Sequence, residues 1–592
     1  MSKQRSFCAY ILLSFLEILP LALPAQLDFL AAPFERDSNA TATYQETIAF
    51  YEALAAQYPQ LKLEAHGSTD SGFPLHLAIL STDGAFFPAA ARAGNKRVLF
   101  INNAIHPGEP CGVDATMLLF RNLLKEASWR PYLEQLVIVA IPFYNISGGL
   151  NRGPYSRANQ NGPKAYGFRG NAKNLDLNRD FIKCDSRNAQ LFNQLFAEWQ
   201  PDVFIDTHSS DGADYQYAIT LIPPQTDKLD PFLSAFLDEL LLPRLYSDME
   251  KAGWEMTPYV YARDTPDKGI AGFLDLPRYS SGYAALHNTI GFTTEAHVWK
   301  PYKDRVQGTY AFLAAVIRAM KEQGAALAEA REKARLHTLE KEQFDLGWEL
   351  DFARSDTISF KGYEAGYKKS KVSGLERMYY DRTMPYEKEI PYFRYYKPTA
   401  SAQRPLAYVI PQAYAEVIER LRWNGVKVER LAADVELELE FSYIEQYETR
   451  ESPYEAHYLH YDVKTKEERL RRQFHKGDYV VFANQAANLY IVETLEPQGA
   501  DSFFAWNFFD GILMQKEYFD GYIFEDTAAE LLRNDPALRE ALEVRRKEDK
   551  DFAESARAQL DFIYRRSPYF EPTFRLYPVG RVWEEVDLPI GR

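Results

Sequence analysis

The chain has 592 residues, a length that predicts about two to four domains. Hydrophobic residues make up 46% and charged residues 26%, which is typical of a soluble globular protein that can bury large cores. The formal net charge is -15, and no long basic run occurs. Nucleic acid is therefore excluded as a partner, because its binding draws on clustered Lys and Arg.

Residues 1–25 have the layout of a secretory signal peptide. Lys3 and Arg5 precede an apolar stretch over residues 7–23, and cleavage fits best after Ala25. Glu17 and Pro20 interrupt the apolar stretch, which argues against a stable membrane span. We therefore expect an exported protein, periplasmic or extracellular, with no stable membrane span once the signal is removed.

The patterns of residues 26–330 predict one α/β catalytic domain. Strands are expected at residues 61–66, 74–80, 97–102, 136–142, 202–206 and 289–294. Helices are expected at residues 40–58, 111–125, 186–199 and from 310 to about 343. Because buried strands alternate with helices, a mixed and largely parallel central sheet is predicted.

Residues 331–592 differ from the first half in composition and pattern, and they predict an α+β accessory region of unknown role. Strands are expected within 345–400 and at 406–410, 426–431, 478–483 and 489–495. Helices are expected up to residue 424 and over 526–564. The mixed-charge run at 464–472 (KTKEERLRR) is typical of a solvated helix face. No motif in this region indicates chemistry.

Two segments that follow predicted strands carry candidate metal ligands. His106-Pro107-Gly108-Glu109 follows the strand at 97–102, and His208 comes just after the strand at 202–206. Imidazole and carboxylate are usual zinc ligands, and α/β sheets place their sites at strand ends. Taken alone, each has an ordinary structural explanation, such as a hydrogen-bonded core histidine.

Two further segments carry candidate catalytic and binding groups. Glu295 follows the strand at 289–294 and could take a proton from a zinc-bound water; the alternatives are a surface glutamate or a partner for His297. Residues 169–181 (RGNAKNLDLNRDF) supply Arg169, Asn178 and Arg179. Arginine binds carboxylates through paired hydrogen bonds, although ion pairs that hold a loop would also explain the cluster.

Together, these segments over about residues 40–320 resemble the zinc carboxypeptidase family, the M14 peptidases. The resemblance implies a central mixed sheet of about eight strands flanked by helices. It further implies one Zn²⁺ on His106, Glu109 and His208, with Glu295 as the general base. The remaining roles that it implies are polarisation of the scissile carbonyl by Arg169, capture of the substrate's terminal carboxylate by Asn178 and Arg179, and closure over bound substrate by Tyr279.

Several positions depart from the family pattern and bear on the substrate. Asp180 replaces a common Asn after the Asn-Arg pair, and Tyr283 competes with Tyr279 for the role of mobile tyrosine. Asp211 and Asp214 follow His208 and could favour a basic substrate or orient the metal ligands.

We therefore predict a zinc metallocarboxypeptidase, a hydrolase that releases C-terminal residues from a peptide or protein by Glu-assisted attack of zinc-bound water. The alternatives are a zinc amidase or deacylase that acts on a non-protein amide or a cell-wall peptide, an endopeptidase, and a noncatalytic binding protein on a peptidase fold. Cys111 and Cys184 could form a disulfide beside the site or stay as two buried thiols. The oligomeric state is not indicated.

Overall fold

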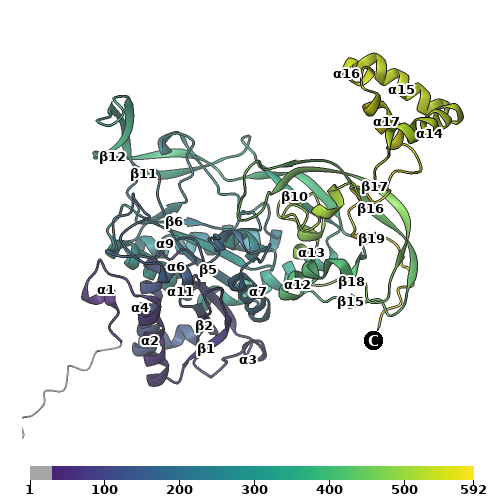
Figure 1. The fold of residues 1–592 in the computed structure, drawn as a ribbon. Helices are drawn as coiled ribbons and strands as arrows, with labels where there is room; N and C mark the ends of the chain where they lie inside the picture. The colour runs from purple at the N-terminus through teal and green to yellow at the C-terminus, as the bar shows by residue number, and fades with distance from the viewer. Residues whose placement is uncertain (1–29, 592) are drawn as a thin grey trace, which may run out of the picture.

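A mixed eight-stranded sheet forms the centre of the computed structural model, which describes residues 30–591 (Figure 1). The strand order is β1-β2-β4-β3-β5-β9-β6-β7. The strands are β1 (Leu61–Ser68), β2 (Pro74–Leu80), β3 (Arg97–Asn102), β4 (Leu136–Ile141), β5 (Val203–Ser210), β6 (Ile219–Ile222), β7 (Met256–Pro258) and β9 (Ile290–His297). The predicted fold class is confirmed. The predicted signal peptide, residues 1–25, lies outside the described residues.

The middle of the sheet is parallel. Strand β3 pairs in parallel with β4 and β5, and β5 pairs in parallel with β9. Every residue of β4 and nearly every residue of β3 and β5 is buried, because helices and loops cover both faces. Four parallel strands therefore end at one edge of the sheet, where the loops after β3, β5 and β9 meet.

Helices cover the sheet on both faces. Those of the first half are α1 (Pro33–Arg36), α2 (Tyr44–Gln57), α3 (Pro88–Ala93), α4 (Cys111–Lys125), α5 (Arg130–Leu133), α6 (Ile146–Leu150), α7 (Arg187–Trp199), α8 (Pro231–Phe236), α9 (Leu242–Lys251), α10 (Ser280–Ala285) and α11 (Tyr302–Glu340). Helix α2 begins at a capping box in which Thr43 and Glu46 bond to each other's backbone N–H groups. No helix within residues 30–591 is both long and apolar enough to cross a membrane.

The second half packs against the first. The core on one face of the central sheet includes Phe100 and Phe204 from the sheet together with Tyr408, Trp506 and Tyr577 from the second half. Residue 330, at which we divided the chain, lies inside α11, and Asn488 bonds to the backbone of Thr338 near the end of that helix. The two halves therefore share one hydrophobic core rather than joining only through a linker.

The second half is built on a six-stranded sheet of order β15-β18-β14-β19-β16-β17 (Figure 1). Its strands are β14 (Ala407–Ile410), β15 (Glu429–Arg430), β16 (Val435–Thr449), β17 (His460–Phe474), β18 (Tyr479–Phe482) and β19 (Gly580–Val582). Two helices of the second half, α12 (Ala415–Trp423) and α13 (Asn488–Leu495), belong to the same body. Smaller sheets contain β8 (Ile270–Ala271), β10 (Gln343–Leu350), β11 (Asp356–Lys369), β12 (Glu376–Phe393) and β13 (Tyr396–Gln403).

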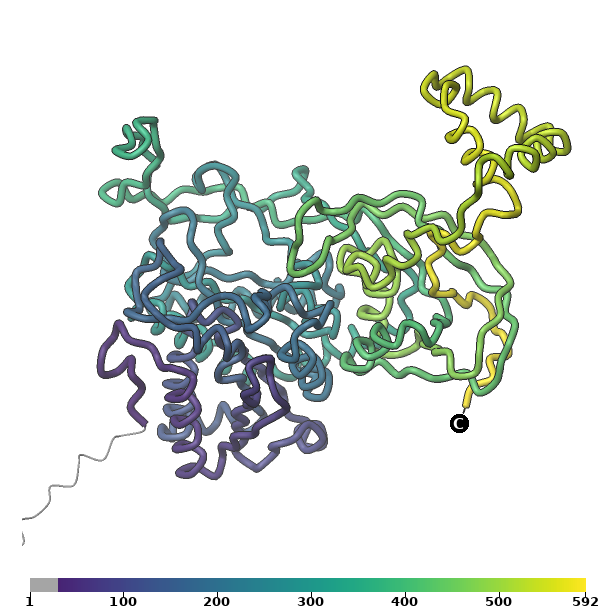
Figure 2. The backbone as a smooth tube through the Cα atoms, viewed as in Figure 1, coloured from purple at the N-terminus to yellow at the C-terminus, as the bar shows by residue number. Residues whose placement is uncertain are grey.

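Two parts of the second half project from the body of the molecule. The hairpin β11–β12 extends at the upper left, and four helices stand apart at the upper right (Figures 1 and 2). These helices are α14 (Gly521–Asn534), α15 (Pro536–Glu548), α16 (Lys550–Ala553) and α17 (Ala556–Tyr564). They form a small apolar cluster of their own, which includes Phe524, Leu542 and Tyr564.

Two predictions for the second half were wrong. Residues 489–495, expected to form a strand, lie in the helix α13, and nearly all of its side chains are buried. An apolar run buried on all sides carries no periodicity that separates a strand from a helix. Residues 464–472, expected to form a helix face, lie in the strand β17. Strand β17 lies at the edge of its sheet and pairs only with β16, so its charged side chains are exposed to solvent. Charged side chains can be hydrated on an exposed strand as well as on a helix, so the run of charges did not distinguish the two.

Candidate active site

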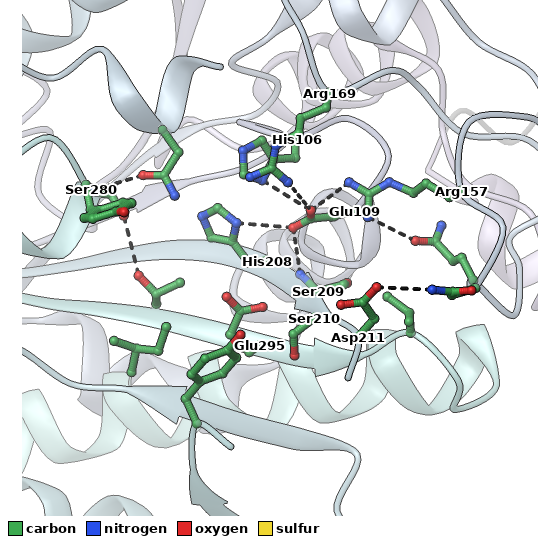
Figure 3. Close-up of a pocket in the computed structure, with 18 of the residues that line it drawn as sticks. His106, Glu109, Arg157, Arg169, His208, Ser209, Ser210, Asp211, Ser280 and Glu295 are labelled. Carbon is green, nitrogen blue, oxygen red and sulfur yellow. Dashed lines mark hydrogen bonds and ion pairs between the residues drawn. The ribbon is translucent and has the colours of Figure 1, made fainter. Parts of the chain in front are cut away.

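A cavity of about 500 Å³ opens where the central parallel strands end (Figure 3). The eight side chains predicted from the sequence all line it. They are His106, Glu109, Arg169, Asn178, Arg179, His208, Tyr279 and Glu295. A volume of this size matches sites that bind small molecules or the end of a peptide.

The three predicted metal ligands face one another in this cavity. Glu109 contacts both histidines, with Oε1 at 3.2 Å from Nδ1 of His106 and Oε2 at 3.2 Å from Nδ1 of His208 (Figure 3). One ligand atom from each residue lies within 4.8 Å of the others, and all three residues are buried. Burial opposes ionisation of Glu109, but His106, Arg157 and His208 hold its pKa well below its ordinary value.

Two carboxylates orient the histidines. Nε2 of His106 lies 2.8 Å from Asp176, and Nε2 of His208 lies 2.8 Å from Asp206. Each histidine therefore presents Nδ1 to the cavity, and Nδ1 of His106 is buried without a hydrogen-bond partner among the described residues. An imidazole nitrogen that makes no hydrogen bond, beside an ionised carboxylate and a second imidazole, fits the donor set and supporting shell of zinc.

Close packing at Gly112 brings these ligands together. This residue lies in the first turn of α4, and a Cβ added to it would lie 1.9 Å from Oγ1 of Thr207 on β5. Only a glycine allows the start of α4 to press against β5 in this way. Glu109, which lies two residues before the start of α4, is thereby placed beside His208 near the end of β5. Its Oε2 also accepts a hydrogen bond of 2.8 Å from the backbone of Ser209.

Glu295 lies directly beside His208. The two residues are register partners on the parallel strands β5 and β9. Oε2 of Glu295 is buried and has no hydrogen-bond partner among the described residues. Burial, together with the nearby charge of Glu109, raises the pKa of Glu295 to about 8, while His208 and Arg169 act in the opposite direction. A cation bound to the neighbouring ligands would favour the ionised form.

A second group in the cavity suits a substrate carboxylate. Arg179 lies over the ring of Tyr279 at 4.5 Å, and Oδ1 of Asn178 accepts a hydrogen bond of 3.1 Å from the backbone of Ser280. Tyr283, the competing candidate, is fully buried and donates to Asn424 at 2.6 Å, so of the two tyrosines only Tyr279 lines the cavity.

Arginines connect the two groups. Nε of Arg169 donates to Asp176 at 2.8 Å, and its Nη1 lies 3.4 Å from Glu109. Arg157, which the sequence analysis missed, donates from Nη2 to Glu109 at 2.7 Å. Nothing in its sequence context signals this role, because the contact depends on how the loop that follows α6 folds back over Glu109.

Of the two roles considered for Asp211 and Asp214, orientation of the metal ligands is wrong. Asp211 is exposed and contacts Asn159, while Asp214 is buried and pairs with Arg382 and Lys300, so neither orients a metal ligand. Asp206 and Asp176 fill that role instead. The Asp-x-His spacing of residues 206–208 puts both side chains on one face of a strand, and this signal could have identified Asp206.

Asp180 and the two cysteines support the loops around the cavity. Asp180 is buried and accepts hydrogen bonds from Lys183 at 2.7 Å and from the backbone of Ser186 at 2.9 Å. Cys111 and Cys184 are buried free thiols, so of the two alternatives the disulfide is wrong. Cys111 contacts Ser209 at 3.5 Å, whereas Cys184 accepts a hydrogen bond from Asn193 at 3.0 Å.

Residues 47–216 match the family model described as zinc carboxypeptidase. This segment contains His106, Glu109 and His208 as well as the Asn-Arg pair. Over this segment the chain is similar to the zinc carboxypeptidases. The resemblance to that family is thus confirmed, and the segment after residue 216 supplies Glu295 and Tyr279 to the same cavity.

Relatives with related names extend beyond this segment. A protein named carboxypeptidase 2 from Trichophyton equinum is 22% identical over 446 residues, which cover 69% of this chain and 74% of the relative. The carboxypeptidase 2 of Trichophyton rubrum matches to the same extent. Among solved structures, a metallo-carboxypeptidase from Burkholderia cenocepacia is 18% identical, with a TM-score of 0.36, over 48% of this chain and 70% of that chain.

Proposed function

We propose that this protein is a zinc metallocarboxypeptidase that releases C-terminal residues from peptides or proteins. One observation carries the proposal. A buried His-Glu-His cluster, in which Nδ1 of His106 makes no hydrogen bond to the described residues, shares a cavity with a buried carboxylate and with an Asn-Arg pair. The first two features suit metal-assisted hydrolysis, and the third suits recognition of a free carboxylate.

In this proposal His106, Glu109 and His208 hold one Zn²⁺. A zinc ion bound in such a site lowers the pKa of a coordinated water to about 7 and polarises a carbonyl. Glu295 takes the proton of the attacking water and then delivers it to the leaving amine. One carboxyl group can serve both steps, because it can accept a proton from water and give it back to the leaving group.

The arginines bind and polarise the substrate. Arg169 is directed toward Glu109 and Asp176, so its guanidinium lies beside the proposed metal ligands and can stabilise charge on the scissile carbonyl. Arg179 and Asn178 bind the terminal carboxylate, and Tyr279, stacked on Arg179, lies where it can close over the substrate. Export through residues 1–25 would place this activity outside the cytoplasm.

Two peptides that differ only at the C-terminus test the proposal. The mature protein is incubated with a peptide that has a free C-terminal carboxylate and with the same peptide amidated, and the products are mapped by mass spectrometry. We expect stepwise loss of C-terminal residues from the free peptide and little or no cleavage of the amidated one. The Glu295→Gln variant serves as the inactive control.

Other product patterns would identify the alternatives. Internal cuts in both peptides would indicate an endopeptidase. Equal hydrolysis of the amidated peptide, or activity confined to cell-wall peptides, would favour an amidase. Binding without hydrolysis at any zinc concentration would favour a noncatalytic protein. Equal activity of the Glu295→Gln variant would contradict the assignment of the base.

A further inference from the structure

The second half of the chain reaches the substrate-binding side of the cavity. We infer that Tyr454, which lies outside the segment that matches the zinc carboxypeptidase model, positions Arg179 for binding of the substrate's terminal carboxylate. The inference rests on the proposed function, since it assumes that Arg179 binds this carboxylate. It gives the accessory region a defined part in substrate recognition.

Contacts on different sides fix the guanidinium of Arg179. Its Nε donates a hydrogen bond of 3.1 Å to the hydroxyl of Tyr454, and its Nη1 donates one of 2.7 Å to the backbone of Asn178. The ring of Tyr279 lies under the guanidinium at 4.5 Å. Within residues 30–591, no protein group accepts a hydrogen bond from Nη2. The contacts therefore hold the plane of the guanidinium and leave one nitrogen for a ligand.

Tyr454 is itself held firmly. Its ring stacks on Trp506 with centroids 6.0 Å apart and an angle of 17° between the planes, and the guanidinium of Arg450 lies 4.5 Å from the ring centroid. Its backbone exchanges hydrogen bonds with that of His457, at 2.7 and 3.1 Å. A tyrosine anchored in this way can present its hydroxyl at one fixed point.

The loop of residues 454–457 also bonds to the segment that carries Arg179 at two further positions. Glu455 accepts a hydrogen bond of 2.7 Å from the backbone of Asp176, and Nε2 of His457 lies 2.8 Å from Asp185. Residues 454–457 therefore bond to residues on both sides of the Asn178-Arg179 pair. No residue of this loop lines the cavity, so the loop acts on substrate only through Arg179 and its neighbours.

A second contact supports the segment that carries Tyr279. Arg278, which precedes Tyr279, pairs with Asp501 at 2.9 Å, and both side chains are buried. Asp501 also accepts a hydrogen bond of 3.0 Å from the indole of Trp506, the residue on which Tyr454 stacks. Arg179 and Tyr279, the two residues that would close around a terminal carboxylate, are thus both supported by the second half. The supporting side chains are Tyr454, Trp506 and Asp501, of which Trp506 contacts the other two.

The Tyr454→Phe variant removes the hydroxyl and keeps the ring stack. Arg179 keeps its charge but loses the acceptor for Nε, so the guanidinium can rotate away from the position suited to the carboxylate. We expect KM for a peptide with a free C-terminus to rise about tenfold, the effect of one hydrogen bond to a charged group, with kcat changed less than twofold. Tyr458→Phe, on the same loop and half exposed, is the matched control and should leave both constants unchanged.

A double-mutant cycle separates positioning from general support of the fold. In the Arg179→Ala background, Tyr454→Phe should cause no further loss of kcat/KM, because the partner that it positions is gone. A merely structural role would give the same loss in both backgrounds. An unchanged KM in Tyr454→Phe, or additive losses in the cycle, would overturn the inference.

A binding measurement distinguishes this inference from the proposed function. The peptide with a free C-terminus is titrated calorimetrically into Glu295→Gln and into Glu295→Gln with Tyr454→Phe. About tenfold weaker binding to the double variant supports the inference even if the wild-type protein does not cleave the peptide. Equal affinities overturn it even if the wild-type protein does, and the proposed function is judged separately by wild-type cleavage.

Discussion

His208 and Glu295 are register partners at the ends of the neighbouring parallel strands β5 and β9. Paired positions on parallel strands direct their side chains to the same face of the sheet. The proposed metal ligand and the proposed base are therefore fixed relative to each other by backbone hydrogen bonds and not by a flexible loop. The strand pairing therefore holds Glu295 beside the proposed metal ligands.

This relationship makes Glu295→Gln the sharpest test of the base. The amide cannot accept the proton of water, yet it keeps the shape of the side chain, so kcat should fall by a factor of about 10² to 10⁴. Zinc content and thermal stability should stay close to those of the wild type. Glu255→Gln, at an exposed position on a neighbouring loop, is the control and should retain full activity. Loss of zinc in Glu295→Gln would show that the residue supports the site and not the chemistry.

One zinc ion per chain should depend on both histidines. His106→Ala and His208→Ala each remove one of three protein ligands, so we expect zinc content, measured by atomic emission, to fall from about one per chain to near zero. Chelation should lower the melting temperature of the wild type, because zinc at 1,000 times its dissociation constant stabilises a fold by about 4 kcal/mol. The control His475→Ala, at an exposed position, should keep its zinc. Full zinc content in either test variant would contradict the ligand assignment.

Arg169→Ala should reduce kcat more than it affects KM. The guanidinium lies beside Glu109 and Asp176, where it can stabilise developing charge on the carbonyl, and removing one such donor costs a factor of about 10² to 10³ in kcat. Steady-state kinetics on a peptide with a free C-terminus measures the change, and Arg187→Ala, at an exposed position nearby, is the control. A rise in KM alone would assign Arg169 to ground-state binding.

Stability should fall as the pH rises because of Glu493. Burial first, and the charge of Asp501 second, raise the pKa of Glu493 to about 8 from an ordinary value of 4.5. Between these values the folded carboxyl is protonated and the unfolded one is ionised, so unfolding releases a proton and rising pH favours it. Between about pH 5 and pH 8, the wild type should therefore lose free energy of unfolding that the Glu493→Gln variant keeps. The difference between the two proteins should grow by roughly 2 to 4 kcal/mol over this range, measured by urea unfolding.

The pH-dependent stability difference arises from burial of the Glu493 carboxyl, so an exposed carboxyl serves as a control. Glu436→Gln changes an exposed carboxyl in the same half of the chain and should show no such pH-dependent gain. A constant difference between wild type and Glu493→Gln across the whole pH range would contradict the raised pKa.

Gly112→Ala should destabilise the protein. The added Cβ would lie 1.9 Å from Oγ1 and 2.4 Å from Cβ of Thr207, so α4 and β5 would have to separate, at a cost of about 1 to 3 kcal/mol. Zinc affinity should fall as well, because Glu109 lies two residues before α4 and His208 lies on β5. Gly324→Ala is the control, since its Cβ would meet only a side-chain atom of Arg97 at 3.4 Å in the middle of α11. That variant should be neutral or slightly more stable.

The sequence predicted the first half of the chain well. The strands at residues 97–102 and 136–142 appear as β3 and β4 within one residue at each end, and the helix at 111–125 is α4. Apolar runs between short turns specify such elements locally, because strands buried on both faces need continuous hydrophobic residues. The metal ligands and Glu295 could be singled out for the same reason, since each follows such a run.

Long-range packing decided what the sequence did not indicate. The role of Asp176, the contact of Arg157 with Glu109 and the free state of Cys111 and Cys184 depend on distances between residues far apart in the chain. Residues 489–495, predicted to form a strand, form the helix α13, which is buried on nearly all sides. Such a run is apolar throughout, so its sequence has no periodicity that distinguishes a helix from a strand.

By itself, the sequence determined which residues could bind a metal and take up a proton, and at which strand ends they would lie. Only the tertiary structure decided that the second half of the chain would reach the same cavity. Tyr454 lies 275 residues after Arg179, and a hydrogen bond across that separation leaves no local pattern. It forms because the two halves bury a common hydrophobic core, which brings a loop from one against the binding segment of the other.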